Sequence, residues 1–178
     1  VLIALNLSAT SYPVNERSVL CERAIETAAS LIFFYVGLKQ EVGLVTTGRG
    51  KTANGGGPSP NGGPSPPGDR EGTYSPIRPG HGHAVSLLEE LACINLSESG
   101  SDLTVRLQRA PLPAGTRLLV VSPPLAEAQA DRLVALKRRG YRVLCYIVGS
   151  WATSREALAV PGLDAVPVLG REDELIRE

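Results

Sequence analysis

The loop Asn6-Leu7-Ser8-Ala9-Thr10 holds the side chains of this sequence whose types and spacing best suit a bound cation. Asn6, Ser8 and Thr10 alternate directly after an apolar run, which is the spacing of a metal-binding loop. Mg²⁺ in proteins is usually held by one or two carboxylates together with neutral oxygens and water. Here an amide, Asn6, stands at the position where such a loop carries a carboxylate, so the shape of a metal site is present without its charge.

Two further loops follow apolar strands, at residues 122–125 and 149–151, and in an open α/β sheet ligands bind beyond such strand ends. Together with residues 8–12 they offer hydroxyls, backbone amides and the indole of Trp151. They contain no histidine, cysteine or carboxylate, whereas acid–base catalysis needs a group that titrates near the working pH. We therefore expect a protein that is not an enzyme.

Two other patterns resemble sites but lack essential parts. Residues 48–52, "GRGKT", end like a phosphate-binding loop, yet Val45 stands where the first glycine belongs and no helix follows. His81 and His83 are the only histidines, and no third ligand of matching spacing accompanies them. We therefore do not expect "GRGKT" to bind a nucleotide, and we interpret the two histidines as solvated loop residues rather than metal ligands.

The elements that would position these loops can be read from apolar spacing. Helical periodicity runs from Asn15, a candidate cap, to Gly37, which marks the helix end. Apolar strands flank this helix at residues 1–7 and 41–47. A strand, a long helix and a second strand predict a parallel pair joined by a right-handed crossover.

The second half of the chain continues this alternation. Strands are predicted at residues 116–122, 141–149 and 165–169, and helices at residues 84–94, from 101 onward, at 125–139 and at 154–159. Strands alternating with helices give an open, mostly parallel α/β sheet. At 178 residues the chain forms one domain over residues 1–178.

Residues 49–79 differ from the rest in composition. Eight glycines and seven prolines fall within this segment, and "GGPSP" occurs twice. So little apolar surface cannot offset the entropy of ordering, and we expect a disordered surface insertion. Within it, "TYSPIR" has the character of a short edge strand, because proline is tolerated at a sheet edge.

Composition narrows the possible partners and the cellular setting. Lys plus Arg equals Asp plus Glu at 18 each, and aromatic residues make up 4%, which disfavours a nucleic-acid partner. Cys21, Cys93 and Cys145 lie far apart in apolar segments, so we expect buried free thiols. No apolar run is long enough to span a membrane. Because Val1 opens the chain inside a core strand, we expect an excised part of a longer protein.

In the order of its segments the chain resembles the von Willebrand factor A-like fold, and more closely the bacterial branch called domain of unknown function 58. The motifs that carry the resemblance are Asn6-x-Ser8-x-Thr10, "AIETAASL", "VGLVTTG", "RPGHGHAVSLLEELACI", "GSDL" and "LLVVSPPL". The resemblance covers nearly the whole chain apart from the insertion. It implies a Rossmann-like sheet ordered 3-2-1-4-5-6, with helices on both faces.

In metal-binding members of that family, an Asp-x-Ser-x-Ser loop, a threonine and a later aspartate hold one Mg²⁺. Carried over by position, these ligands fall on Asn6, Ser8 and Thr10, on Ser101, and on Pro123 after Ser122.

Two of those positions have lost a carboxylate, because Asn6 and Pro123 replace the family's aspartates. Asp102 is the nearest remaining carboxylate, and helix capping explains it equally well. We predict a degenerate site that binds no metal or other cofactor, Mg²⁺ being disfavoured by the lost charge.

The resemblance further implies a protein-interaction module in a membrane-anchored protein that works with a MoxR-type AAA+ ATPase, its soluble domain facing the cytoplasm. The contact surface would comprise the degenerate positions, Asp102 and Trp151. The alternative is a metal-independent domain or enzyme that binds a small ligand or phosphate on a Rossmann-like scaffold. There, backbone amides around residues 8–10 would hold the anion.

Overall fold

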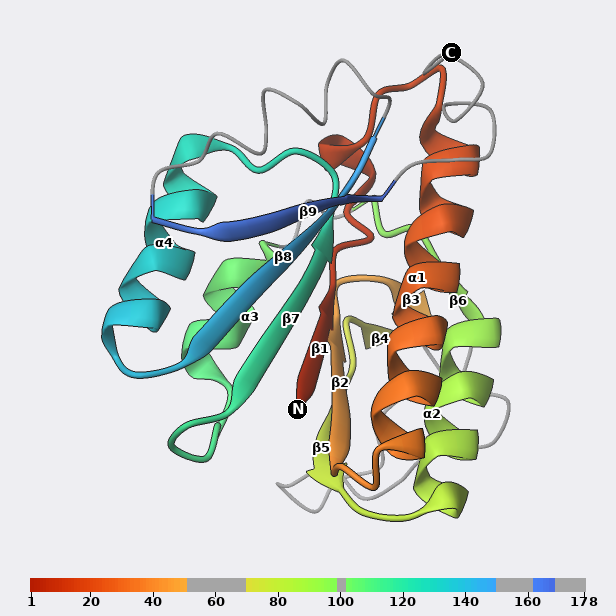
Figure 1. The fold of residues 1–178 in the computed structure, drawn as a ribbon. Helices are drawn as coiled ribbons and strands as arrows, with labels where there is room; N and C mark the ends of the chain where they lie inside the picture. Colours follow the sequence, from red (N-terminus) through yellow and green to blue (C-terminus); the bar gives the residue numbers. More distant parts are fainter. Residues whose placement is uncertain (51–69, 99–101, 150–161, 169–178) are drawn as a thin grey trace, which may run out of the picture.

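The computed structural model describes residues 1–50, 70–98, 102–149 and 162–168 (Figure 1). A six-stranded sheet runs through its centre. Its strands are β1 (Leu2–Leu5), β2 (Val42–Thr46), β5 (Tyr74–Arg78), β7 (Arg117–Ser122), β8 (Arg142–Val148) and β9 (Asp164–Val168). Every neighbouring pair is parallel except β2 and β5. The predicted α/β class with a mostly parallel sheet is therefore confirmed.

The strands of the main sheet lie in the order β5-β2-β1-β7-β8-β9. Counted within this sheet alone, that order is 3-2-1-4-5-6. The chain departs from the simple six-strand pattern in having three further strands, β3 (Arg49–Gly50), β4 (Arg70–Glu71) and β6 (Ile94–Asn95), which form a small second sheet. Strands of two residues have no detectable periodicity, so the sequence could not predict them.

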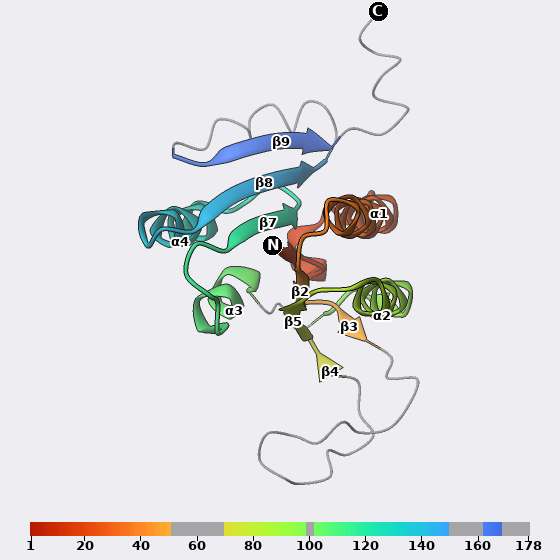
Figure 2. The ribbon, with the colours of Figure 1, turned by 60° about the horizontal axis from the view of Figure 1, so that its bottom comes forward.

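Helices cover both faces of the main sheet, as Figure 2 shows. Those on one face are α1 (Arg17–Gly37) and α2 (His81–Ala92), and those on the other are α3 (Leu103–Arg109) and α4 (Glu127–Arg138). A 3₁₀ turn, η1 (Ala9–Ser11), follows β1. Within the described segments, no helix has both the length and the apolar character needed to cross a membrane.

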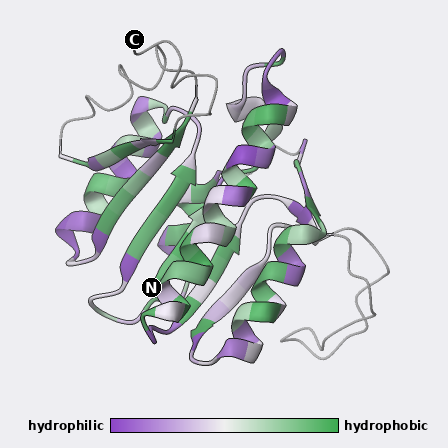
Figure 3. Ribbon diagram, turned by 45° about the vertical axis from the view of Figure 1, so that its right-hand side comes forward, coloured by the Kyte–Doolittle hydropathy of each residue, from purple (hydrophilic) through white to green (hydrophobic). Residues whose placement is uncertain are grey.

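Strand β1 joins the two halves of the core. Its side chains alternate between faces, so Ile3 and Leu5 pack in the cluster beneath α1 and α2, whereas Leu2 and Ala4 pack beneath α3 and α4. All four are fully buried. Figure 3 shows the resulting hydrophobic strands between helices that carry both hydrophilic and hydrophobic segments. This two-sided burial explains why β1 reads as a continuous apolar run.

Two helix starts differ from the prediction. The α1 helix begins at Arg17, and its N-cap is Glu16 rather than Asn15, without a side-chain capping bond. The α2 helix begins at His81, three residues before Ala84, where the apolar pattern begins. Its first turn is largely exposed and polar, so this turn left no periodic signal.

The insertion predicted to be disordered, residues 49–79, includes strands at both of its ends. Residues 49–50 form β3, and residues 70–78 contain β4 and β5, while residues 51–69 lie outside the described residues. The β5 strand pairs antiparallel with β2 at the edge of the main sheet, where Pro76 is tolerated. The edge strand expected for "TYSPIR" is thus confirmed. Pairing with β2 orders this stretch, although the surrounding segment is rich in glycine and proline.

The three cysteines do not share one environment. Cys21 and Cys145 are buried, and burial raises the pKa of their thiols to about 11 and about 12. Cys93 is exposed at the carboxyl end of α2, so the prediction of a buried thiol is wrong for this residue. It caps α2 between two buried residues, Leu91 in the helix and Ile94 in β6, so its apolar neighbours do not report its own exposure.

Candidate functional site

The loops that follow β1 and β7 meet at the carboxyl edge of the sheet, and we call residues 8–15 and 122–125 the crest. Leu5 is paired with Val121, and the backbone N–H of Asn6 donates to the Val121 carbonyl at 2.9 Å. The two loops therefore begin side by side. In sheets of this kind the edge where the strand order reverses is where ligands bind.

Asn6 ties the crest together with its side-chain amide. It is only 2% exposed, and its Oδ1 accepts from the backbone N–H of Ser8 at 3.1 Å and from Thr47 Oγ1 at 3.3 Å. Because a backbone N–H can only donate, the atom facing Ser8 must be the amide oxygen. The Nδ2 group donates to Ser122 Oγ at 3.1 Å and to Ser11 Oγ at 3.4 Å. All four hydrogen-bonding positions of the amide are thus in use.

Tyr12 fixes the same turn through the backbone. Its hydroxyl donates to the Asn6 carbonyl at 2.6 Å, and the side chain is buried. Burial and the neighbouring Cys21 thiol raise the pKa of Tyr12, so the phenol stays protonated and remains a donor. The turn is therefore closed by a bond that does not titrate in the ordinary pH range.

The hydroxyls of Ser8 and Thr10 pair with each other. Their Oγ atoms are 2.9 Å apart, with Ser8 buried and Thr10 exposed. Behind them, the Ala9 N–H donates to the Ser97 carbonyl and the Ser97 N–H donates to the Leu7 carbonyl, each at 2.9 Å. Both of these backbone bonds join the loop to Ser97, which fixes its path on that side.

Asp102 caps α3 and does not belong to the Asn6 network. Its Oδ1 accepts from the Thr104 N–H at 2.8 Å and the Thr104 hydroxyl at 2.7 Å, while Oδ2 pairs with Arg132. Desolvation raises the pKa of Asp102, but these hydrogen bonds and the Arg132 charge outweigh it and hold the pKa below its ordinary value. Both oxygens of the carboxylate are therefore engaged.

The predicted site residues are only partly brought together. Ser8 and Thr10 share the crest with Ser122 and Pro123, and Asn6 lies two residues before it; Pro123 is buried directly after β7. Ser101 and Trp151, the two remaining predicted positions, lie outside the described residues.

The oxygen atoms that the crest and Asn6 could offer as ligands do not suit Mg²⁺. The oxygens around Asn6 belong to one amide and to hydroxyls, and the amide oxygen already accepts two bonds. Nothing in the network supplies the anionic ligand that offsets the dehydration of Mg²⁺. Over the described ranges, no three His, Cys, Asp or Glu residues are grouped so that they could hold a metal ion.

Thr47, which completes this network, was not among the predicted site residues, whereas Ser11 and Tyr12 fall within the predicted loop at residues 8–12. Thr47 lies just past β2 and accepts the Leu7 N–H at 2.8 Å, and Tyr12 and Ser11 close the turn. Thr47 could have been found from its position, because it is a hydroxyl residue at the end of β2, the strand next to β1. The three predicted loops, at residues 8–12, 122–125 and 149–151, follow β1, β7 and β8, and the end of β2 is not among them.

Two patterns that resemble sites in the sequence, "GRGKT" and the histidine pair, contribute described residues to elements of the fold. Arg49 and Gly50 belong to β3, so "GRGKT" does not enter a helix there. His83 lies on α2, and its Nε2 is 3.1 Å from the carbonyls of Val42 and Pro76. Because both partners are acceptors, Nε2 carries the proton. The solvated-loop interpretation is wrong for His83, which ties α2 to the sheet edge.

A scan against protein-family models finds no match for this chain, and a search of curated proteins finds none. The family resemblance therefore stays a prediction.

Proposed function

We propose that this chain is a non-catalytic protein-interaction module that binds its partner through the crest. The observation that carries the proposal is Val14, whose side chain is 78% exposed two residues beyond Tyr12. The turn before Val14 is held by the buried Asn6 network. An apolar side chain presented by a rigid loop can bind a partner at little entropic cost.

The hydrogen bonds of the crest support a binding role over a catalytic one. A nucleophilic hydroxyl needs a base in contact with it, but Ser8 Oγ is paired with the Thr10 hydroxyl. Ser122 Oγ accepts from the Asn6 amide, which is not a base. These serines serve to hold the loop in place.

The identity of the partner rests on the family resemblance. It supports a MoxR-type AAA+ ATPase as the partner, and a full-length protein anchored in a membrane with this domain on the cytoplasmic side. The crest would then contact the ATPase without a bridging metal ion.

Binding of a purified MoxR-type ATPase from the same organism to the immobilised chain tests this proposal. Val14→Asp should weaken binding by about tenfold or more, because burial of a valine side chain is worth about 1.5–3 kcal/mol. Val166→Asp, at a 40% exposed position on β9, is the matched control and should leave this affinity unchanged. Failure of the unmodified chain to bind, or full binding by Val14→Asp, would reject the proposal.

For the alternative, a site for a small anionic ligand, a hollow beside α3 offers a different place from the backbone amides of residues 8–10. It has a volume of about 600 Å³, and its lining includes Arg106, Arg109 and Tyr74 as well as Asp102, whose carboxylate is paired with Arg132. That volume falls within the usual range for ligand pockets, and guanidinium groups suit phosphate or carboxylate. A thermal-shift screen with nucleotides and sugar phosphates tests it: stabilisation by several degrees, lost in Arg109→Ala, would favour this alternative.

A further inference from the structure

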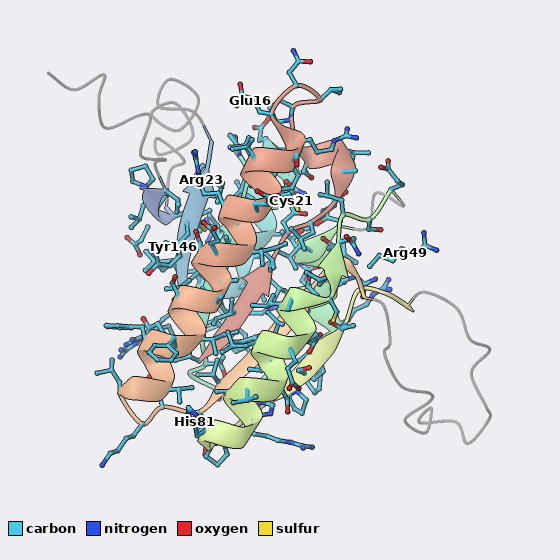
Figure 4. The ribbon with its side chains drawn as sticks, turned by 90° about the vertical axis from the view of Figure 1, so that its right-hand side faces the viewer. Glu16, Cys21, Arg23, Arg49, His81 and Tyr146 are labelled. Atoms are coloured by element: carbon cyan, nitrogen blue, oxygen red, sulfur yellow. The ribbon has the colours of Figure 1, made fainter. Side chains whose placement is uncertain are left out.

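A second surface, at the opposite end of α1 from the crest, forms an apolar groove of about 460 Å³ between α1 and α2. Figure 4 shows the two helices side by side, with Glu16 at the start of α1 and His81 at the far end beside α2. The 21 residues of α1 separate the two surfaces by about 30 Å along the helix. The groove is thus a separate surface.

The groove exposes large apolar side chains to water. Phe33 on α1 is 70% exposed and Val85 on α2 is 40% exposed, and both line it together with Val36 and Leu88. Phe34 on α1 and Leu38, the residue that caps this helix, are also exposed. A groove between two helices with such walls is suited to receive apolar side chains from another protein.

Lys39, just past the end of α1, is the charged side chain that lines the groove, and it lies beside the polar side chains of Gln40 and of His81 at the start of α2. Among the described residues, no aspartate or glutamate lines the groove. The polar side chains thus mark the end of the groove where α1 ends and α2 begins.

Lys39 occupies a backbone conformation that favours glycine. Its φ is +57°, and it is the one non-glycine residue with positive φ in the described parts of the chain. The Lys39 N–H donates to the Val36 carbonyl and the Gln40 N–H donates to the Tyr35 carbonyl, which is the Schellman pattern of a helix end. A lysine at this position adds a fixed positive charge to the groove where glycine would fit with less strain.

We propose that the groove docks a segment of a partner protein that carries apolar side chains next to an aspartate or glutamate. The apolar side chains would lie between Phe33 and Val85, and the carboxylate would face Lys39 and His81. Charge complementarity selects an acidic occupant over a basic one. This second contact goes beyond the crest and does not depend on it.

Phage-displayed random dodecapeptides, selected on the unmodified chain, provide the test. Enriched peptides should combine Leu, Ile, Val or Phe with Asp or Glu. A synthetic copy of an enriched peptide should bind about tenfold more weakly to Val85→Asp and several-fold more weakly to Lys39→Gly. Glycine retains the positive φ of residue 39, so the second variant removes the charge without disturbing the helix end. Val14→Asp should bind the peptide normally, which separates this site from the crest.

Three results would overturn the proposal. The first is that no peptide is enriched above a parallel selection on Val85→Asp. The second is that enriched peptides are basic, or bind Lys39→Gly as tightly as the unmodified chain. The third is self-association of the unmodified chain that Val85→Asp abolishes, which would make a second copy the occupant.

Discussion

The amide nitrogen of Asn6, just past β1, donates a 3.1 Å hydrogen bond to the hydroxyl of Ser122, at the end of β7 and 116 residues later in the chain. This bond joins the loops of two adjacent strands at the centre of the crest. A carboxylate at position 6 could not make it, since a carboxylate only accepts. The asparagine therefore holds the loop by hydrogen bonding where the resemblance would place a charged metal ligand.

Asn6→Asp should destabilise the protein by about 2 kcal/mol or more at pH 7. The change removes both Nδ2 donors and places a charge at a position that is 2% exposed. Guanidinium unfolding monitored by circular dichroism measures the effect. Asn95→Asp, the same change at an exposed position, is the control and should alter the free energy of unfolding by less than about 0.5 kcal/mol. Equal effects of the two variants would contradict this role for Asn6.

Tyr12→Phe should cost about 1 kcal/mol of stability. It removes the hydroxyl that donates to the Asn6 carbonyl and leaves that buried acceptor without this donor. Urea unfolding of the variant is compared with that of Tyr74→Phe, at an exposed tyrosine. If both variants unfold at the urea concentration of the unmodified protein, the Tyr12 bond does not support the turn.

Asp102 should make part of the stability pH-dependent. Its folded-state pKa is lowered, so its contribution is fully present above the ordinary aspartate pKa of about 3.9 and is lost as the pH falls through the lower folded-state value. Asp102→Asn should flatten this acid limb while keeping a helix cap, and Asp102→Ala should cost about 1 kcal/mol more through loss of the cap. Thermal unfolding between about pH 2 and pH 7 gives both quantities. An unchanged acid limb in Asp102→Asn would show that another group is responsible.

Cys93 should be the reactive thiol of the folded protein. It is exposed, whereas burial raises the pKa of Cys21 and Cys145 and shields both from reagents. Reaction with a disulfide reagent should label one thiol rapidly under native conditions and all three in guanidinium. Cys93→Ser should abolish the rapid phase, and a rapid phase that survives in this variant would place a second thiol at the surface.

The strands and long helices were predictable because burial imposes a regular pattern. The two-sided burial of β1 makes a continuous apolar run, and the spacing of Ala24, Ala28 and Ile32 marks the buried face of α1. Val19 also fits the apolar pattern of this helix, although it is exposed. An apolar residue at a helical position does not reveal whether another element covers it.

The crest was predictable in outline but not in its bonds. The resemblance to a known sheet order suggested that Asn6 and Ser122 follow adjacent strands, and the register confirms that their strands pair. Which hydroxyls meet the Asn6 amide depends on the geometry of η1 and on Thr47 beside it. The groove between α1 and α2 also depends on packing, since Phe33 and Val85 are far apart in the sequence.

Titration of Mg²⁺ and Mn²⁺ into the unmodified protein, followed by calorimetry, tests most directly whether the crest works without a metal ion. The hydrogen bonds of Asn6 predict no saturable binding tighter than about 1 mM, the weak end of protein sites for divalent cations. Saturable binding below about 1 mM that is lost in Ser8→Ala would contradict this. It would show that the crest hydroxyls still hold a cation despite the amide at position 6.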